Sequence, residues 1–384
     1  MAIPQDWSDE LLDQKRQRTD ALADEAMAQL VAQKGREEAQ RIFNLLIREI
    51  ELPISQLPAE LRPFFAATNR LPAWVDPDKV AKAQALFRDH GPKFLVFLYY
   101  KSLPILYLCK NGAEVLLQTG RLAHLQDEAM KVFTRRIAET GQFIVDVMSE
   151  GNLAEGKQGI QSIQKVRLIH AAIRHFIPAE QWDAELLGQP INQEDMAITL
   201  MTFSIAILDA LAGFGIQEPE DTLEAYLHTW TGIGFLLGID PDLLPATLAQ
   251  ARHLQEKILR RQEGASEAGQ LLTQALLQFA HDTLPRRLDA TPELLIQHLI
   301  GRERAQLLGV APPFGCLSIA LPDAIATLLK LGEKLEDKIA GEPLGQFIDH
   351  LSRKTVLAMV NFFNVYKGSH FSLSAQLKEA WLGI

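Results

Sequence analysis

Residues 166–174 read Val166-Arg167-Leu168-Ile169-His170-Ala171-Ala172-Ile173-Arg174 and have the pattern of a helix. Side chains three or four residues apart lie on one helix face, so Arg167, His170 and Arg174 are stacked along the same side. Two cations beside an imidazole make a poor apolar core. The arrangement suits a bound group that has a coordination site at its centre and anions at its rim.

Haem has this shape. Its iron would be bound by the imidazole of His170, and its two propionates by Arg167 and Arg174, because planar guanidinium groups suit carboxylates. The spacing also fits a second interpretation, in which His170 is an ordinary core or surface histidine. His228 is the main rival as a ligand, but no arginines flank it, which favours a packing role.

Other segments on both sides of this helix occur in a characteristic order. Arg136 and Thr140 lie one turn apart on a second predicted helix. Over about residues 120–310, the ordered segments resemble the catalytic domain shared by rubber oxygenases (latex clearing proteins) and mpaB-type oxygenases. The segments are residues 126–140, 166–174, 182–183, 188–204 and 224–239.

This resemblance implies an all-α fold and a non-covalent haem b whose proximal metal ligand is His170. It places Arg167 and Arg174 beside that ligand as cofactor-binding residues. It also implies that Arg136 and Thr140 line the opposite, distal side of the haem.

Glu139 is the place where the chain departs from the rubber-cleaving members, which carry a lysine directly before the threonine. A carboxylate there could act as a weak iron ligand, or as a base and proton donor toward bound dioxygen or peroxide. We therefore expect Arg136, Glu139 and Thr140 to form the catalytic side of the site. The departure argues against rubber as the substrate.

The composition limits the partners and the type of haem. The 384 residues include 38 basic and 48 acidic residues, and the formal charge of −10 disfavours binding to nucleic acid or anionic lipid. A small hydrophobic substrate and dioxygen are the expected partners. Cys109 and Cys316 are isolated and form no attachment motif, so coordination and packing alone would hold a b-type haem.

The first residues show no basic and apolar export signal, which predicts a cytoplasmic protein. The stretch Ala197–Ile216 approaches the length of a membrane span, but it contains Asp209. We interpret it as a buried helix and expect no stable membrane insertion.

Helical periodicity recurs along the chain, and alternating β-branched runs are nearly absent, which predicts an all-α protein. Residues 1–55 are expected to form a helical arm that covers the core or meets a second subunit in a homo-oligomer. Residues 56–384 are expected to form one large helical domain with haem between its core helices. Residues 78–118 predict two helices separated near His90-Gly91-Pro92.

The leading hypothesis is a haem b-dependent oxygenase that oxidises or cleaves a hydrophobic unsaturated substrate. The alternative is a haem-binding protein without oxygenase activity, such as a sensor, a carrier or a peroxidase-like scavenger. A purely structural helical protein is the third hypothesis. The sequence does not separate the first two.

Overall fold

Helices make up the described part of the chain, which in this computed structural model comprises residues 7–48, 58–122, 129–283, 291–311, 348, 351–353, 355–357, 360 and 371–382. Within these ranges no β-strand is present, and the predicted all-α class is confirmed. Cys316 lies outside the described residues. The named α-helices are α1 (Asp9–Arg16), α2 (Ala21–Lys34), α3 (Arg36–Arg48), α4 (Arg62–Ala67), α5 (Pro77–Phe97), α6 (Leu103–Leu108), α7 (Lys110–Leu122), α8 (Ala129–Met148), α9 (Gln158–Phe176), α10 (Ala184–Leu187), α11 (Gln193–Phe203), α12 (Ile205–Gly213), α13 (Glu220–Leu236), α14 (Leu248–Gln262), α15 (Glu267–Thr283), α16 (Thr291–Ile300), α17 (Arg302–Leu307) and α20 (Ala375–Leu382).

Polar side chains begin several of these helices by binding free backbone N–H groups. Asp20 accepts from Ala23 N at the start of α2, and Asn192 accepts from Asp195 N at 3.0 Å at the start of α11.

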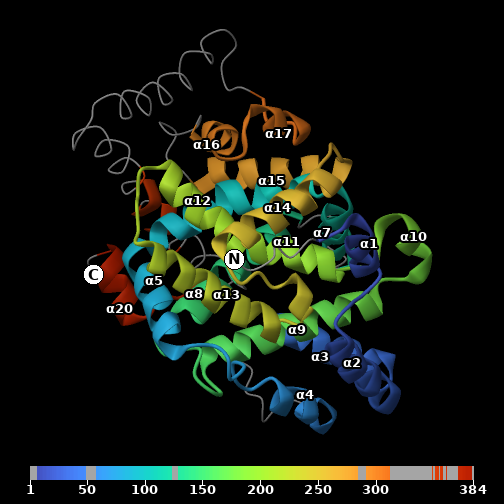
Figure 1. Ribbon diagram of the computed structural model, residues 1–384. Coiled ribbons are helices and arrows are strands. Elements are labelled where there is room, and N and C mark those ends of the chain that lie inside the picture. The colour runs from blue at the N-terminus through green and yellow to red at the C-terminus, as the bar shows by residue number, and fades with distance from the viewer. Residues whose placement is uncertain are drawn as a thin grey trace, which may run out of the picture.

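The helix α9 lies between two apolar clusters. One face, with Leu168 and Ala172, packs against the N-terminal helices α2 to α4, where Met27 and Phe64 are buried. Figure 1 shows α2 and α3 beneath α9 and the remaining core helices above it. The opposite face of α9 carries His170 and looks toward the main core.

The N-terminal helices cover the core, which is one of the two arrangements that the sequence left open. The Trp7 side chain is fully buried, and its indole N–H donates to the Asp242 carbonyl at 2.7 Å. The Lys15 ammonium binds the carboxylates of Asp240 and Asp242 at 2.6 and 2.7 Å. A second subunit bound through this arm stays a prediction.

Helix α5 continues through Pro92, so the predicted break near Gly91-Pro92 was wrong. Pro92 has no N–H to donate to the Arg88 carbonyl. The indole N–H of Trp381 in α20 donates to that oxygen instead, at 2.8 Å. Gly91 makes room for the indole, because a Cβ at this position would lie 1.9 Å from it. A side chain 293 residues away thus supplies the missing hydrogen bond.

The long apolar stretch predicted to be a buried helix forms α11 and α12, which Ser204 separates. Among the described residues, one helical segment, Gln193–Gly213, is long enough and apolar enough to cross a membrane, judged by length and composition alone. Of its most apolar window, 78% is buried inside the protein. This burial is typical of a core helix.

Candidate active site

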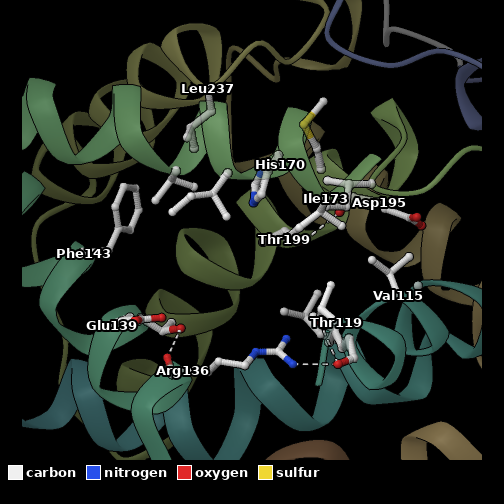
Figure 2. Close-up of a pocket in the computed structure, with 18 of the residues that line it drawn as sticks. Val115, Thr119, Arg136, Glu139, Phe143, His170, Ile173, Asp195, Thr199 and Leu237 are labelled. Carbon is white, nitrogen blue, oxygen red and sulfur yellow. Dashed lines mark hydrogen bonds between the residues drawn. The ribbon is translucent and has the colours of Figure 1, made fainter. Parts of the chain in front are cut away.

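A cavity of about 850 Å³ lies between α8 and α9. The helices α6, α7 and α11 close its other sides with mostly apolar side chains, and the volume is in the range of cofactor and ligand sites. Figure 2 shows His170 on one wall and Glu139 and Arg136 on the opposite wall. The antiparallel packing of α8 on α9 places these two walls face to face.

His170 carries a neutral imidazole on the cavity wall. Burial lowers its pKa to about 3, and the positive charge of Arg174 acts in the same direction. The ring nitrogen Nδ1 is buried and has no hydrogen-bond partner among the described residues. A neutral, unpartnered imidazole is the form of histidine that binds a metal.

Glu139, Arg136 and Thr140 all line the cavity, as predicted. The Arg136 Nη1 donates to the Leu116 carbonyl at 2.6 Å, and the Thr140 hydroxyl donates to the Arg136 carbonyl at 2.7 Å. Burial lowers the pKa of Arg136. Burial raises the pKa of Glu139 to about 7, although the charges of Arg135 and Arg136 oppose that shift. Glu139 can therefore hold or release a proton near neutral pH.

Arg167 does not line this cavity with His170. Its Nε and Nη2 donate to the two carboxylate oxygens of Asp20 at 2.5 and 2.7 Å, and its Nη1 donates to the Leu236 carbonyl at 2.9 Å. The guanidinium is buried in these contacts. The role predicted for Arg167 at a haem propionate stays a prediction. Its contacts argue against that role, because each of its three nitrogens already donates a hydrogen bond and the side chain does not line the cavity.

Arg174 is also held outside the residues that line the cavity. Its Nε donates to the Asp24 carboxylate at 2.7 Å, and its Nη1 donates to the Ile191 carbonyl at 3.3 Å. Helix twist explains why both arginines point elsewhere. Successive residues turn by about 100°, so Arg167 and Arg174 lie about 60° and about 40° to the same side of His170. On that side both meet the carboxylates at the start of α2.

Asp195 is a cavity residue that the sequence did not single out. Its carboxylate lies at the cavity edge and accepts from Arg16 Nη1 at 3.2 Å and from Asn192 Nδ2 at 2.8 Å. Burial raises its pKa to about 6, against the charge of Arg16. Its place depends on α11 crossing the cavity, for which the sequence carried no local signal.

Arg135 is a second residue that the sequence reasoning missed. It lines the cavity one turn before Glu139, and its Nε lies 3.4 Å from the Glu139 Oε1. Its proximity in sequence to Arg136 and its spacing of four residues from Glu139 could have indicated it.

The rival histidines lie elsewhere. His228 accepts a hydrogen bond from the Asp76 N–H at 2.9 Å and packs edge-on against Trp74, so it has the packing role expected for it. His175 contacts Phe176 edge-on. In the part of the chain that the structure describes, no group of three or more histidine, cysteine or acidic side chains could hold a metal. Cys109 is buried at the cavity wall, and burial raises its pKa.

Residues 99–348 match the family described as "ER-bound oxygenase mpaB/B'/Rubber oxygenase, catalytic domain". The chain belongs to this family. The matched range includes the predicted stretch of about residues 120–310, and the resemblance drawn from the sequence is confirmed.

A curated member of the family, the rubber oxygenase of Streptomyces sp. (strain K30), is 26% identical over 227 residues. The alignment covers 58% of this chain and 53% of that protein, so this chain spans about half the length of the relative. The structure of latex clearing protein in the closed state is similar, with a TM-score of 0.69, 21% identity and 94% of each chain covered. This likeness confirms the single helical domain.

Proposed function

We propose that this chain is a haem b-dependent oxygenase that acts on a small hydrophobic, unsaturated substrate. The observation that carries the proposal is the neutral, unpartnered imidazole of His170, which faces Glu139 and Arg136 across an apolar cavity. The family supports an oxygenase.

The residues of the cavity fit a b-type haem. His170 would bind the iron, and the apolar side chains of α6, α7 and α11 would pack against the macrocycle. When bound, haem supplies an iron centre that activates dioxygen. The apolar lining excludes water and holds a hydrocarbon chain beside the cofactor.

The distal wall supplies charge and a proton. Arg136 is fixed by the Leu116 carbonyl and keeps a positive field in the cavity, which favours negative charge that develops on oxygen. Glu139 is poised near neutral pH to donate or accept a proton at its carboxyl oxygen. Arg167 and Arg174 take part indirectly, because their ion pairs with α2 hold the helix that carries His170.

Titration of the purified chain with haemin tests the cofactor. We expect a Soret band of histidine-ligated haem, which acidified organic solvent then extracts because no covalent attachment is made. His170→Ala should remove or shift this band, while His175→Ala, on the same helix, should leave it unchanged. An unchanged spectrum in His170→Ala would overturn the assignment of the ligand.

Activity separates the oxygenase from the alternative haem protein. Loaded protein should consume oxygen with apolar alkenes and form oxygenated or cleaved products. A protein that binds haem through His170 but turns over no alkene would instead be a sensor, a carrier or a peroxidase-like protein. Turnover of polyisoprene would overturn the expectation that Glu139 excludes rubber.

A further inference from the structure

A polar stripe on α8 runs along the otherwise apolar cavity. Arg135, Glu139, Gln142 and Asp146 follow the helix repeat and all line the cavity. Gln142 donates to Asp146 at 2.7 Å and accepts from the Ser372 N–H at 2.7 Å. The C-terminal half of the stripe therefore has hydrogen-bond partners within the protein. In the N-terminal half of the stripe, Arg135 and Glu139 lie beside each other.

The Arg135 guanidinium has unused binding capacity. Its Nε is buried and makes no hydrogen bond with any of the described residues, and its contact with Glu139 is a long ion pair of 3.4 Å. A buried donor without an acceptor costs free energy. Since burial raises the pKa of Glu139 to about 7, this partner is uncharged in a large share of molecules at neutral pH.

The neighbouring arginines have closer partners than Arg135 does, although the Nη2 of Arg174, which lies 2.7 Å from the Asp24 carboxylate, also makes no hydrogen bond among the described residues. The Arg136 guanidinium is bonded to a backbone carbonyl, and Arg167 and Arg174 are paired with carboxylates of α2. The side chain of Arg135 keeps 27% of its surface accessible and lines the cavity. An anion that enters the cavity therefore meets an available guanidinium.

We propose that Arg135 binds a carboxylate of the molecule that fills this cavity. A planar guanidinium can hold a carboxylate through two parallel hydrogen bonds. Apolar side chains make up most of the remaining lining, so the occupant is an amphiphile with an acidic end. This carboxylate belongs either to a haem propionate, which rests on the proposed function, or to an apolar substrate that is itself an acid.

The first arm of the test compares haemin with its dimethyl ester, which lacks the two charges. Arg135→Gln should weaken the binding of haemin about tenfold or more and leave the binding of the ester unchanged, if the carboxylate is a propionate. Arg135→Lys should restore part of the affinity. Arg260→Gln is the matched control, because Arg260 forms an exposed ion pair with Glu256 at the same spacing of four residues.

The second arm measures oleate and oleyl alcohol by calorimetry, with the chain as purified and after loading with haem. Arg135→Gln should weaken oleate binding about tenfold and spare the alcohol, if the carboxylate belongs to a substrate. Glu139→Gln should have the opposite effect and raise the affinity for haemin or oleate, because it removes the carboxylate that competes for the Arg135 guanidinium. A merely structural role of Arg135 would give no such opposite effects.

The inference is overturned if Arg135→Gln binds haemin and oleate as Arg260→Gln does. Helical circular dichroism checks that both variants are folded. The two proposals can fail separately. A wild-type chain without a haem spectrum defeats the proposed function, while selective loss of oleate binding in Arg135→Gln would still support the role of Arg135.

Discussion

Glu139 lines the cavity and has a pKa near neutral pH. Its side chain keeps 32% of its surface accessible because it faces the cavity, and most of its surroundings are protein. The pKa is raised to about 7 mainly because burial penalises the charged form. The protein therefore binds the Glu139 proton more tightly when folded than when unfolded.

This raised pKa predicts how stability depends on pH. Below about pH 4.5, the ordinary pKa of a glutamate, the protonated carboxyl carries no burial penalty. The free energy of unfolding then falls as the pH rises toward 7. Glu139→Gln should remove this fall and be more stable than wild type at pH 8 by about 1–2 kcal/mol, after allowance for solvent in the cavity. Urea denaturation from pH 4 to pH 8 measures it.

Glu256→Gln serves as the control for this experiment, since the Glu256 side chain on α14 keeps 46% of its surface accessible. Its stability should follow the wild-type pH profile. Parallel profiles for Glu139→Gln and wild type would mean that the carboxylate is well solvated.

At the scale of elements, two ion pairs hold α9 to α2. Asp20 and Asp24 lie one turn apart on the N-terminal side, and they bind Arg167 and Arg174, which are two turns apart on α9. The Asp20–Arg167 pair is fully buried, whereas the Asp24 side chain keeps 31% of its surface accessible. The two pairs should therefore differ in strength.

Asp20→Asn should destabilise the protein by about 3–5 kcal/mol, because it leaves the Arg167 charge buried without its partner. Asparagine still caps α2, so the loss reports the ion pair and not the cap. Asp24→Asn should cost about 1 kcal/mol or less. Guanidinium denaturation compares them, and equal costs would contradict the difference in burial.

At the junction of α5 and α20, the Trp381 indole replaces the hydrogen bond that Pro92 cannot donate to the Arg88 carbonyl, and this replacement can be tested. Trp381→Phe keeps an aromatic ring against Phe87 but leaves the Arg88 carbonyl without a donor, at a cost of about 1–3 kcal/mol. In Pro92→Ala the new N–H can bind this carbonyl, so the cost of Trp381→Phe should fall by about 1 kcal/mol. A double-mutant cycle measures this coupling, and additive effects would argue against it.

At the scale of the molecule, buried charges join the N-terminal helix to the core. The Glu194 carboxylate has no exposed surface and accepts from Arg16 at 3.0 Å, from Arg261 at 3.0 Å and from Gln262 at 2.9 Å. Helices α1, α11 and α14 meet at this point. The arm predicted for residues 1–55 thus contributes to the same buried network as the core.

Arg16→Leu should lower the free energy of unfolding by about 3–5 kcal/mol, because it removes a cation that serves both Glu194 and Asp195. Arg18→Leu, with an exposed side chain, should change it by less than about 1 kcal/mol. Thermal unfolding of both variants checks this. A separate early transition of the arm, with the core unaffected, would contradict the shared network.

The family resemblance predicted much of the site. Arg136, Glu139 and Thr140, which it placed on the distal side, line the cavity, and His170 faces them. Spacing along a helix added that Arg136 and Thr140 lie one turn apart, because such spacing is a short-range property that the sequence records directly. The family resemblance was recognised for a similar reason, since ordered helical motifs survive at low identity. Haem, cytoplasmic location and a homo-oligomer remain predictions.

The amino-acid sequence alone determined the helical class, the helix that carries His170 and the acidic residue opposite to it. Only the tertiary structure decided which side chains are available to an occupant: Arg167 is taken by Asp20, 147 residues away, and Arg135 is left without a strong partner. The physical reason is that helix formation depends on near neighbours, whereas the pairing of a buried charge depends on which distant helix packs against it.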